Sequence, residues 1–225
     1  MTLSSSLNCS ASLKAKHLDF SFLIWYSVGG SLIGATPFCT MKKLPATAIL
    51  GADPGVNGGL ALADTKKKVI YYTAMPKNME NFGYFCNALT PIKNRKMYIE
   101  HMSYAQGGRK DAEGKFIRIS NPRSMGVLGQ NAGFLQGNAM AMGYKIEEVW
   151  PQSWMGRIGA HDTGLSYNDK GWKNNLKRIA AESFPSAKVT LKNADAFLIL
   201  LDAYRRLVED PEASMADWEV IQVKF

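Results

Sequence analysis

The chain has 225 residues, of which 46% are hydrophobic, so it can form one medium-sized domain with a core and is not a disordered polymer. Its net charge of +8 favours a polyanionic partner such as nucleic acid, with plain solubility charge as the alternative. Its three cysteines, Cys9, Cys39 and Cys86, are odd in number and lack C-x-x-C spacing, which argues against a disulfide framework and favours a reducing compartment.

The first forty residues differ in composition from the rest of the chain. They are rich in serine and contain an uncharged stretch from Phe20 to Cys39. A signal peptide or weak membrane anchor, an organellar transit peptide, and a translation start at Met41 are three interpretations of this segment. We favour the third, which leaves 1–40 as a disordered or mis-assigned extension and 41–225 as one cytoplasmic domain. A transit peptide would instead direct the domain to an organelle.

Three strands are predicted at the beginning of the domain. Residues 47–53, 58–64 and 67–75 are rich in β-branched, apolar or aromatic side chains, and the links between them are of hairpin length. Apolar residues at helical spacing over 78–89 then predict a helix, and a short strand is expected over 96–100.

The second half of the domain alternates helices with a strand. The polar, basic and glycine-bearing stretch 107–124 predicts a loop, 125–143 a helix and 145–151 a strand. A helix over 168–184, capped by Asn168 or Ser166, and a long helix over 193–209 complete the chain. Three antiparallel strands followed by alternating helices and strands indicate an α/β domain with a mixed five-stranded sheet flanked by helices.

Three carboxylates stand at the ends of predicted elements. Asp53 and Glu100 end two strands, and Asp195 lies in the first turn of the last helix. Taken singly, each has a simpler explanation as a turn residue, a solvated strand end or a helix N-terminal acid. Sites in α/β sheets form beyond the carboxyl ends of strands, however, where Asp53 and Glu100 can converge. Converging carboxylates without His or Cys suit Mg²⁺, with Mn²⁺ as an alternative, and two such ions can promote phosphodiester cleavage.

In this order, the motifs resemble those of RuvC-type Holliday junction resolvases of the RNase H-like superfamily. The resemblance is carried by GADPGVNGGLALAD, MYIEHMSY, VLGQNAGFLQGNAMAMGYKIEEVWPQSW, NDKGWKNNLKRIA and NADAFLILLDAYRR. It covers about residues 48–207 and lies in order and spacing, not in long identities. The stretches SMG, GQNAG and WPQSW are more similar to the phage-encoded branch.

The resemblance implies an RNase H-like nuclease domain over 41–225, with Asp53, Glu100 and Asp195 as catalytic, metal-binding acids. Family members commonly carry a further acid, or His, one turn before the last acid, where this chain has Lys192 and Asn193. The fourth ligand is therefore absent, a water or Asn193. Asp202, two turns further along the helix, is expected to be structural or solvated.

Basic residues flank the predicted site. The run after Glu100 could be a solvated loop, but beside a catalytic strand end it predicts DNA-backbone contacts and an aromatic stacked on an exposed base. Lys170 matches the basic helix start of the family, and Lys192 is placed to reach the acidic site. The predicted DNA-binding residues are Tyr104, Arg109, Lys110, Lys115, Arg118, Arg123, Lys170, Lys173 and Lys192.

Glycines at 129, 133 and 137 recur on one face of the helix over 125–143. Close packing of this helix on the sheet is one interpretation. The resemblance adds another, a homodimer contact, because RuvC-like enzymes dimerise through a helix of this region. Gln130 and Asn131 argue against a membrane helix.

The expected function is a metal-dependent endonuclease that resolves four-way or other branched DNA in recombination and repair. It would act as a homodimer with no membrane association. A catalytically weak junction-binding protein of the same fold is the main alternative, since one acid is missing. An actin-like ATPase is a third possibility, but the chain is too short for two such lobes.

Overall fold

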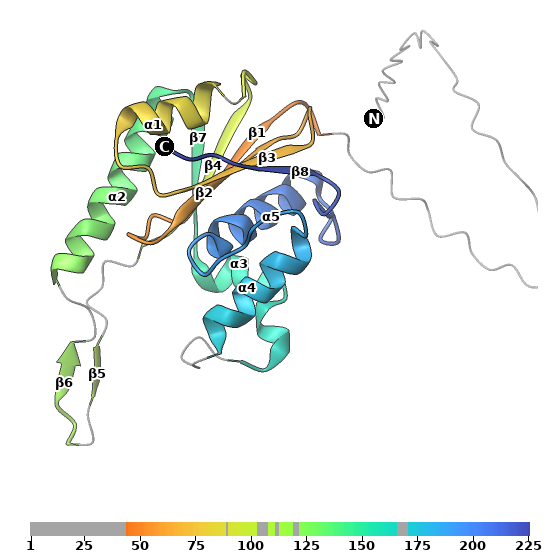
Figure 1. Ribbon diagram of the computed structural model, residues 1–225. Helices are drawn as coiled ribbons and strands as arrows, with labels where there is room; N and C mark the ends of the chain where they lie inside the picture. Colours follow the sequence, from red (N-terminus) through yellow and green to blue (C-terminus); the bar gives the residue numbers. More distant parts are fainter. Residues whose placement is uncertain (1–43, 89, 103–107, 111–112, 119–121, 166–170) are drawn as a thin grey trace, which may run out of the picture. The chain divides into compact units, whose positions relative to one another are not determined.

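The computed structural model describes residues 44–88, 90–102, 108–110, 113–118, 122–165 and 171–225 (Figure 1). The chain divides into two units, 1–39 and 40–225, and the described residues all belong to the second. The interpretations of the segment 1–40 therefore concern residues outside the described part of the chain. Within the described ranges, no helix combines the length and apolar character needed to cross a membrane.

Three antiparallel strands form the centre of the main sheet, as the sequence predicts. β1 (Ala48–Ala52) pairs with β2 (Gly59–Asp64), and β2 pairs with β3 (Val69–Ala74). Every residue of β1 and β2 is buried. These two strands are near-continuously apolar because the sheet is covered on both faces, which leaves no solvent-facing side to alternate with polar residues.

Parallel strands extend the sheet on both sides of this centre, in the order β7-β4-β1-β2-β3-β8. β4 (Arg95–Glu100) runs parallel to β1, and β7 (Tyr144–Val149) runs parallel to β4. The predicted α/β class with a mixed sheet and flanking helices is confirmed. The sheet has six strands, not five, because β8 (Glu219–Gln222) pairs with β3. Four residues are too few to show a hydrophobic period in the sequence.

The helices connect these strands and differ from the predictions mainly at their ends. α2 begins three residues earlier than predicted, and α3, which was not predicted, begins at a proline directly after β7, where proline is favoured. Asn168 and Ser166, the predicted caps of α4, lie outside the described residues. The helices are α1 (Met79–Gly83), continued by a π-helical turn (Tyr84–Ala88), α2 (Pro122–Ala141), α3 (Pro151–Arg157), a 3₁₀ turn (Ala160–Thr163), α4 (Trp172–Ser183) and α5 (Ala194–Val208).

The stretch predicted as a basic loop is in part a β-hairpin. β5 (Gly108–Lys110) and β6 (Phe116–Arg118) pair in antiparallel fashion as a separate two-stranded sheet. The loop prediction is therefore wrong for these six residues. Each strand has only three residues and is flanked by glycine and charged residues, so no strand period is visible in the sequence.

Helices cover both faces of the main sheet (Figure 1). Alternate residues of β1, such as Ile49 and Leu50, contribute to opposite cores, as the period of a strand requires. The core that contains Ile49 is completed by α3, α4 and α5, and the core that contains Leu50 by α1, the π-helical turn and α2. Residues of β4 alternate in the same way, so each strand-end side chain has a defined face.

Close packing of α5 on β1 depends on Gly51. A Cβ atom at this position would lie 2.6 Å from the carbonyl oxygen of Ala196 and 2.7 Å from the backbone nitrogen of Leu200. Both neighbours are helix backbone and cannot rotate away. Gly51 therefore sets how near the first turns of α5 come to the carboxyl end of β1.

We predict that Gly51→Ala lowers the free energy of unfolding by about 1–3 kcal/mol, the usual effect of overpacking a rigid core. Gly156→Ala is the matched control, because a Cβ atom at this exposed helical glycine meets nothing within 4 Å. The control should be neutral or slightly stabilising. Denaturant titration of both variants measures the difference, and equal stabilities would contradict the packing role of Gly51.

Candidate active site

The three predicted acids meet at the carboxyl ends of β1 and β4. Asp53 directly follows β1 and Glu100 ends β4, and the pairing of Ala52 with Ile99 makes the two acids neighbours in register. Side-chain alternation directs both toward the α5 face of the sheet. Asp195 lies in the first turn of α5 and is 4% exposed. The sequence prediction that strand-end acids converge is thus reproduced by the geometry.

A tight turn holds Asp53 in place. Its Oδ1 accepts a hydrogen bond of 2.8 Å from the backbone N–H of Gly55, and Gly58 donates its N–H to the Gly55 carbonyl. A Cβ atom at Gly58 would lie 2.2 Å from the Asp53 carbonyl oxygen, so only glycine fits there. Asn131 of α2 donates to the Pro54 carbonyl at 3.1 Å and ties the turn to the other face of the sheet. The Asp-Pro-Gly sequence is therefore an Asx turn that orients a partly buried carboxylate.

Burial and mutual repulsion raise the pKa of two of the acids. For Glu100, burial is the larger cause, followed by the charges of Asp53 and Asp195, and its pKa rises from 4.5 to about 8. Burial also raises the pKa of Asp53, and Asp195 adds to the rise, while the Gly55 hydrogen bond and Lys173 oppose it. These shifts mean that the cluster resists full ionisation unless a positive charge is nearby.

Lys173 of α4 supplies a positive charge to the cluster. Its Nζ lies 2.5 Å from Oδ2 of Asp195. Burial lowers the pKa of Lys173, but attraction to Asp195, Glu100 and Asp53 outweighs burial and leaves the pKa above its usual value. Lys173 was predicted as a DNA contact, and the structure places it instead as the ion-pair partner of a candidate catalytic acid.

Two carboxylate oxygens of the cluster are buried without a hydrogen-bond partner: Oε2 of Glu100 and Oδ1 of Asp195. Unpartnered buried oxygens are costly and are typical of positions that receive an ion or water. The donor set consists of oxygens, which suits Mg²⁺ or Mn²⁺. Among the described residues, however, no three His, Cys, Asp or Glu side chains lie in a metal-binding arrangement. The donor chemistry fits a divalent cation, and in this structure the ammonium group of Lys173 lies against one of the three acids, Asp195.

Trp154 of α3 is a site residue that the sequence did not reveal. It is fully buried, and its indole N–H lies near enough to Glu100 to lower the pKa of that carboxyl, without forming a hydrogen bond of good geometry. Only the position of α3 over the end of β4 brings the two together. The local sequence around Trp154 carries no signal for this proximity.

Lys192 and Asn193 do not supply the group that the family usually places before its last acid. α5 begins at Ala194, so Lys192 precedes the helix, and the ion pair of Asp195 is made by Lys173. The Asn193 side chain accepts hydrogen bonds from the backbone and hydroxyl of Thr190 and donates to the Lys188 carbonyl. Asn193 is therefore committed to shaping the loop before α5 and is not placed as a fourth ligand.

Some of the other predicted DNA-binding residues lie within the described part of the chain and some lie outside it. Tyr104 and Lys170 lie outside the described residues. Arg109, Lys110 and Arg118 belong to the hairpin strands β5 and β6. Lys115, in the connection between these strands, and Arg123, in the first turn of α2, are exposed. Their contact with DNA stays a prediction.

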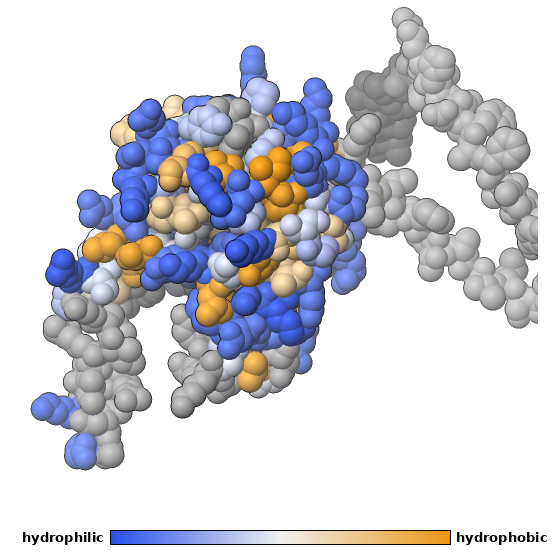
Figure 2. Space-filling view, in the orientation of Figure 1, coloured by the Kyte–Doolittle hydropathy of each residue, from blue (hydrophilic) through white to orange (hydrophobic). Residues whose placement is uncertain are grey.

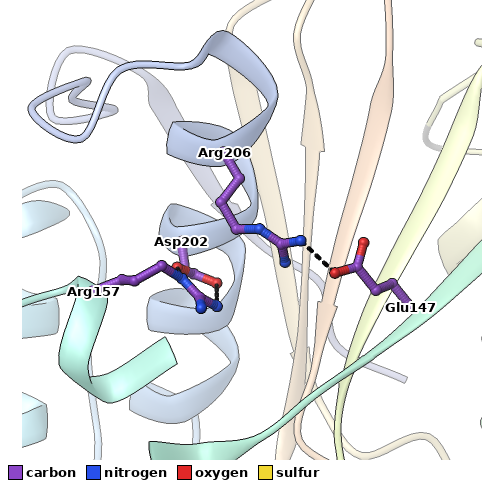
Figure 3. Close-up of polar contacts among 4 residues, drawn as sticks. All are labelled: Glu147, Arg157, Asp202 and Arg206. Atoms are coloured by element: carbon purple, nitrogen blue, oxygen red, sulfur yellow. Dashed lines mark hydrogen bonds and ion pairs between the residues drawn. The ribbon is translucent and has the colours of Figure 1, made fainter. Parts of the chain in front are cut away.

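Asp202 is structural, as one of the two sequence interpretations stated. It is 2% exposed and forms two hydrogen bonds with Arg157, of 2.6 and 2.8 Å (Figure 3). Arg206 of the same helix reaches in the other direction to Glu147 of β7. These ion pairs attach α5 to α3 and to the sheet, and thereby fix the helix that carries Asp195.

Comparisons with known proteins give a likeness of fold. No protein-family model matches the sequence, and no curated protein matches it significantly. A Thermus thermophilus RuvC in complex with a Holliday junction substrate is 13% identical, with a TM-score of 0.43 over 71% of this chain and 94% of that chain. A second Thermus thermophilus RuvC structure is 12% identical, with a TM-score of 0.39 over 71% of this chain and 95% of that one.

We predict that Glu100→Gln stabilises the cation-free protein at alkaline pH. The folded-state pKa of about 8 lies above the ordinary value of 4.5. The destabilisation from ionised Glu100 is therefore absent at low pH, grows between these values and is complete above about pH 8. At pH 9 in EDTA the variant should gain on the order of 2 kcal/mol, or about 4–8 °C in Tm, and should differ little from wild type at pH 5.

Glu148→Gln is the control for this experiment. Hydrogen bonds from His101 and Gln136 lower the pKa of Glu148, so its neutralisation should bring no gain at pH 9. Thermal melts of the three proteins across the pH range give the measurement. Parallel curves for wild type and Glu100→Gln would mean that Glu100 is not held in a repulsive cluster.

Proposed function

We propose that this protein is a metal-dependent, structure-selective endonuclease that hydrolyses phosphodiester bonds at four-way or other branched DNA. The observation that carries the proposal is the convergence of Asp53, Glu100 and Asp195 in one partly buried cluster, in which two carboxylate oxygens are buried without a partner. Three acids that are held together against their mutual repulsion are more consistent with a catalytic site than with a structural one. The basic chain and the sequence resemblance to RuvC-type resolvases support the choice of DNA as substrate.

Asp53, Glu100 and Asp195 would hold Mg²⁺ in the proposed enzyme. A bound ion would activate a water molecule and stabilise the leaving oxygen of the phosphodiester. The chain's own residues orient and insulate the site: the Asx turn fixes the Asp53 carboxylate, and the buried indole of Trp154 covers Glu100. Lys173 pairs with Asp195 and offsets part of the negative charge of the cluster.

The exposed face of α2 supports a homodimer. Cβ atoms at Gly126, Gly133 and Gly137 would meet nothing within 4 Å, and Met140 on the same face is 67% exposed. Packing on the sheet therefore does not explain Gly133 and Gly137, two of the three glycines that recur in the sequence, or Gly126. Each costs about 0.5–1 kcal/mol relative to alanine in a helix, which a close helix–helix contact with a second copy would offset. A two-fold dimer would present two sites to two equivalent DNA strands.

A junction-binding protein without cleavage is the second candidate. The observation that favours it is the ion pair between Lys173 and Asp195, since a lysine already occupies one carboxylate of the cluster. Incubation of a four-way junction and a linear duplex with the protein, with and without Mg²⁺, discriminates the two. Mg²⁺-dependent, symmetric nicking of the junction supports the nuclease, and tight binding without nicking supports the second candidate.

We predict that Asp53→Asn abolishes cleavage and leaves junction affinity within about threefold of wild type, because a metal ligand is lost while the basic surface stays. Asp217→Asn is the matched control, since Asp217 is exposed and pairs with Lys68 at 3.2 Å. A gel assay of cleavage together with fluorescence anisotropy of binding measures both effects. Wild-type cleavage by Asp53→Asn would remove Asp53 from the active site.

We predict that Gly133→Arg converts the dimer to a monomer without unfolding the domain, because its side chain enters open space in one chain and the proposed contact in a pair. Gly156→Arg, on the exposed part of α3, makes the same change outside that face and should leave the dimer intact. Analytical ultracentrifugation at several concentrations gives the oligomeric state. Identical sedimentation of both variants and wild type would exclude α2 as the interface.

A further inference from the structure

Four lysines lie along one side of the acidic site and define what we call the lysine groove: Lys77, Lys188, Lys192 and Lys224. Lys188, Lys192 and Lys224 line one depression of about 320 Å³, which also reaches Gly58. Lys224 lines a second depression together with Lys77. The two depressions share Ala74, Gln222 and Lys224 as lining residues, so they adjoin.

The lysine groove begins at the turn that holds the candidate catalytic acid. Gly58, at one end of the groove, packs against the backbone and carboxylate of Asp53. At the other end, Lys77 also lines a depression beside Asn131 of α2, the residue that is hydrogen-bonded to Pro54. A ligand that follows the groove therefore passes alongside the turn between β1 and β2.

No Asp or Glu lines the lysine groove among the described residues, and none of its four lysines has an Asp or Glu partner there. The pocket beside α5, of about 410 Å³, is different. It contains Arg157 and Arg206, but Asp202 and Glu147 neutralise them (Figure 3). Positive charge is thus internally balanced next to α5 and unbalanced in the groove.

The backbone of the lysine groove is fixed. Asn193 is buried and hydrogen-bonds to both Thr190 and the Lys188 carbonyl, which holds the loop that carries Lys188 and Lys192. Val223 continues the pairing of β8 by donating to the Tyr72 carbonyl. The ring of Phe225 packs edge-on against Tyr84 at 5.9 Å, which anchors the chain on both sides of Lys224. In Figure 2, hydrophilic residues surround smaller apolar patches on the face that β8 crosses.

We propose that the lysine groove binds the phosphodiester backbone of one DNA arm of the branched substrate. This inference rests on the proposed function and adds a substrate-binding surface formed by the loop before α5, the end of β3 and the residues after β8. All four lysines are exposed, and they are spread along an open groove instead of converging on one buried point. Spaced, exposed ammonium groups suit a repeating polyanion, whereas a single small anion needs converging donors.

The test compares two triple variants of the full chain that remove the same charge. The groove variant is Lys188→Gln, Lys192→Gln and Lys224→Gln. The control variant changes Lys66, Lys93 and Lys145 to Gln; these exposed lysines lie at the opposite end of the main sheet, near the start of β1, β4 and β7. Dissociation constants for a four-way junction and a linear duplex are measured by anisotropy in EDTA across a range of NaCl concentrations.

The groove variant should bind the junction at least tenfold more weakly than the control variant at physiological salt. Its log–log salt slope should be smaller by about two to three units, one for each lost phosphate contact. Replacement of the same lysines by Arg should restore both values, which excludes a folding defect as the cause. Equal salt slopes for the groove and control variants would overturn the inference.

The experiments distinguish a wrong assignment of the lysine groove from a wrong assignment of the nuclease function. If wild type does not cut the junction with Mg²⁺, the nuclease proposal fails, while a difference in slope between the two triple variants still supports the groove. If wild type cuts the junction and the two slopes agree, the nuclease proposal stands and the groove is wrong.

Discussion

The candidate active site depends on three carboxylates, of which Asp195 is buried and Asp53 and Glu100 partly buried, with the ammonium group of Lys173 beside Asp195. Asp53, Glu100 and Asp195 repel one another, and this repulsion, together with burial, raises the pKa of Glu100 to about 8. Lys173 offsets part of the repulsion through its ion pair with Asp195. Two carboxylate oxygens nevertheless remain without a partner. A cluster with this residual negative charge is suited to accept a divalent cation, and it is the feature from which the proposed chemistry follows.

The rest of the fold keeps that cluster together. Parallel pairing of β1 with β4 places Asp53 and Glu100 side by side, and Gly51 allows α5 to bring Asp195 against them. The ion pair of Asp202 with Arg157 holds α5 further along its length. Each of these contacts is distant in sequence. The position of the acids is therefore a property of the assembled sheet and helices, and a change in helix packing would alter the site without touching an acid.

The strand-end acids could be predicted from the sequence because strand periodicity and the geometry of α/β sheets are local and general rules. The role of Lys173 could not, because it depends on how α4 packs against α5. Its place in a basic helix is equally consistent with DNA contact. Strand β8 and the hairpin of β5 with β6 are too short to show a period, and Asn193 is drawn into the loop by hydrogen bonds that the sequence does not reveal. Of the four lysines of the groove, the sequence pointed only to Lys192, because the residues of the groove come from three separate segments.

Proton release on cation binding shows whether the three acids hold a divalent ion. Isothermal titration of Mg²⁺ or Mn²⁺ into the protein near pH 7, in buffers of different ionisation enthalpy, measures both binding and the number of protons released. Because Glu100 is largely protonated at that pH when its pKa is about 8, we expect saturable binding with release of close to one proton per chain, and loss of that release in Glu100→Gln. Absence of saturable binding, or the same proton release from Glu100→Gln, would contradict this expectation.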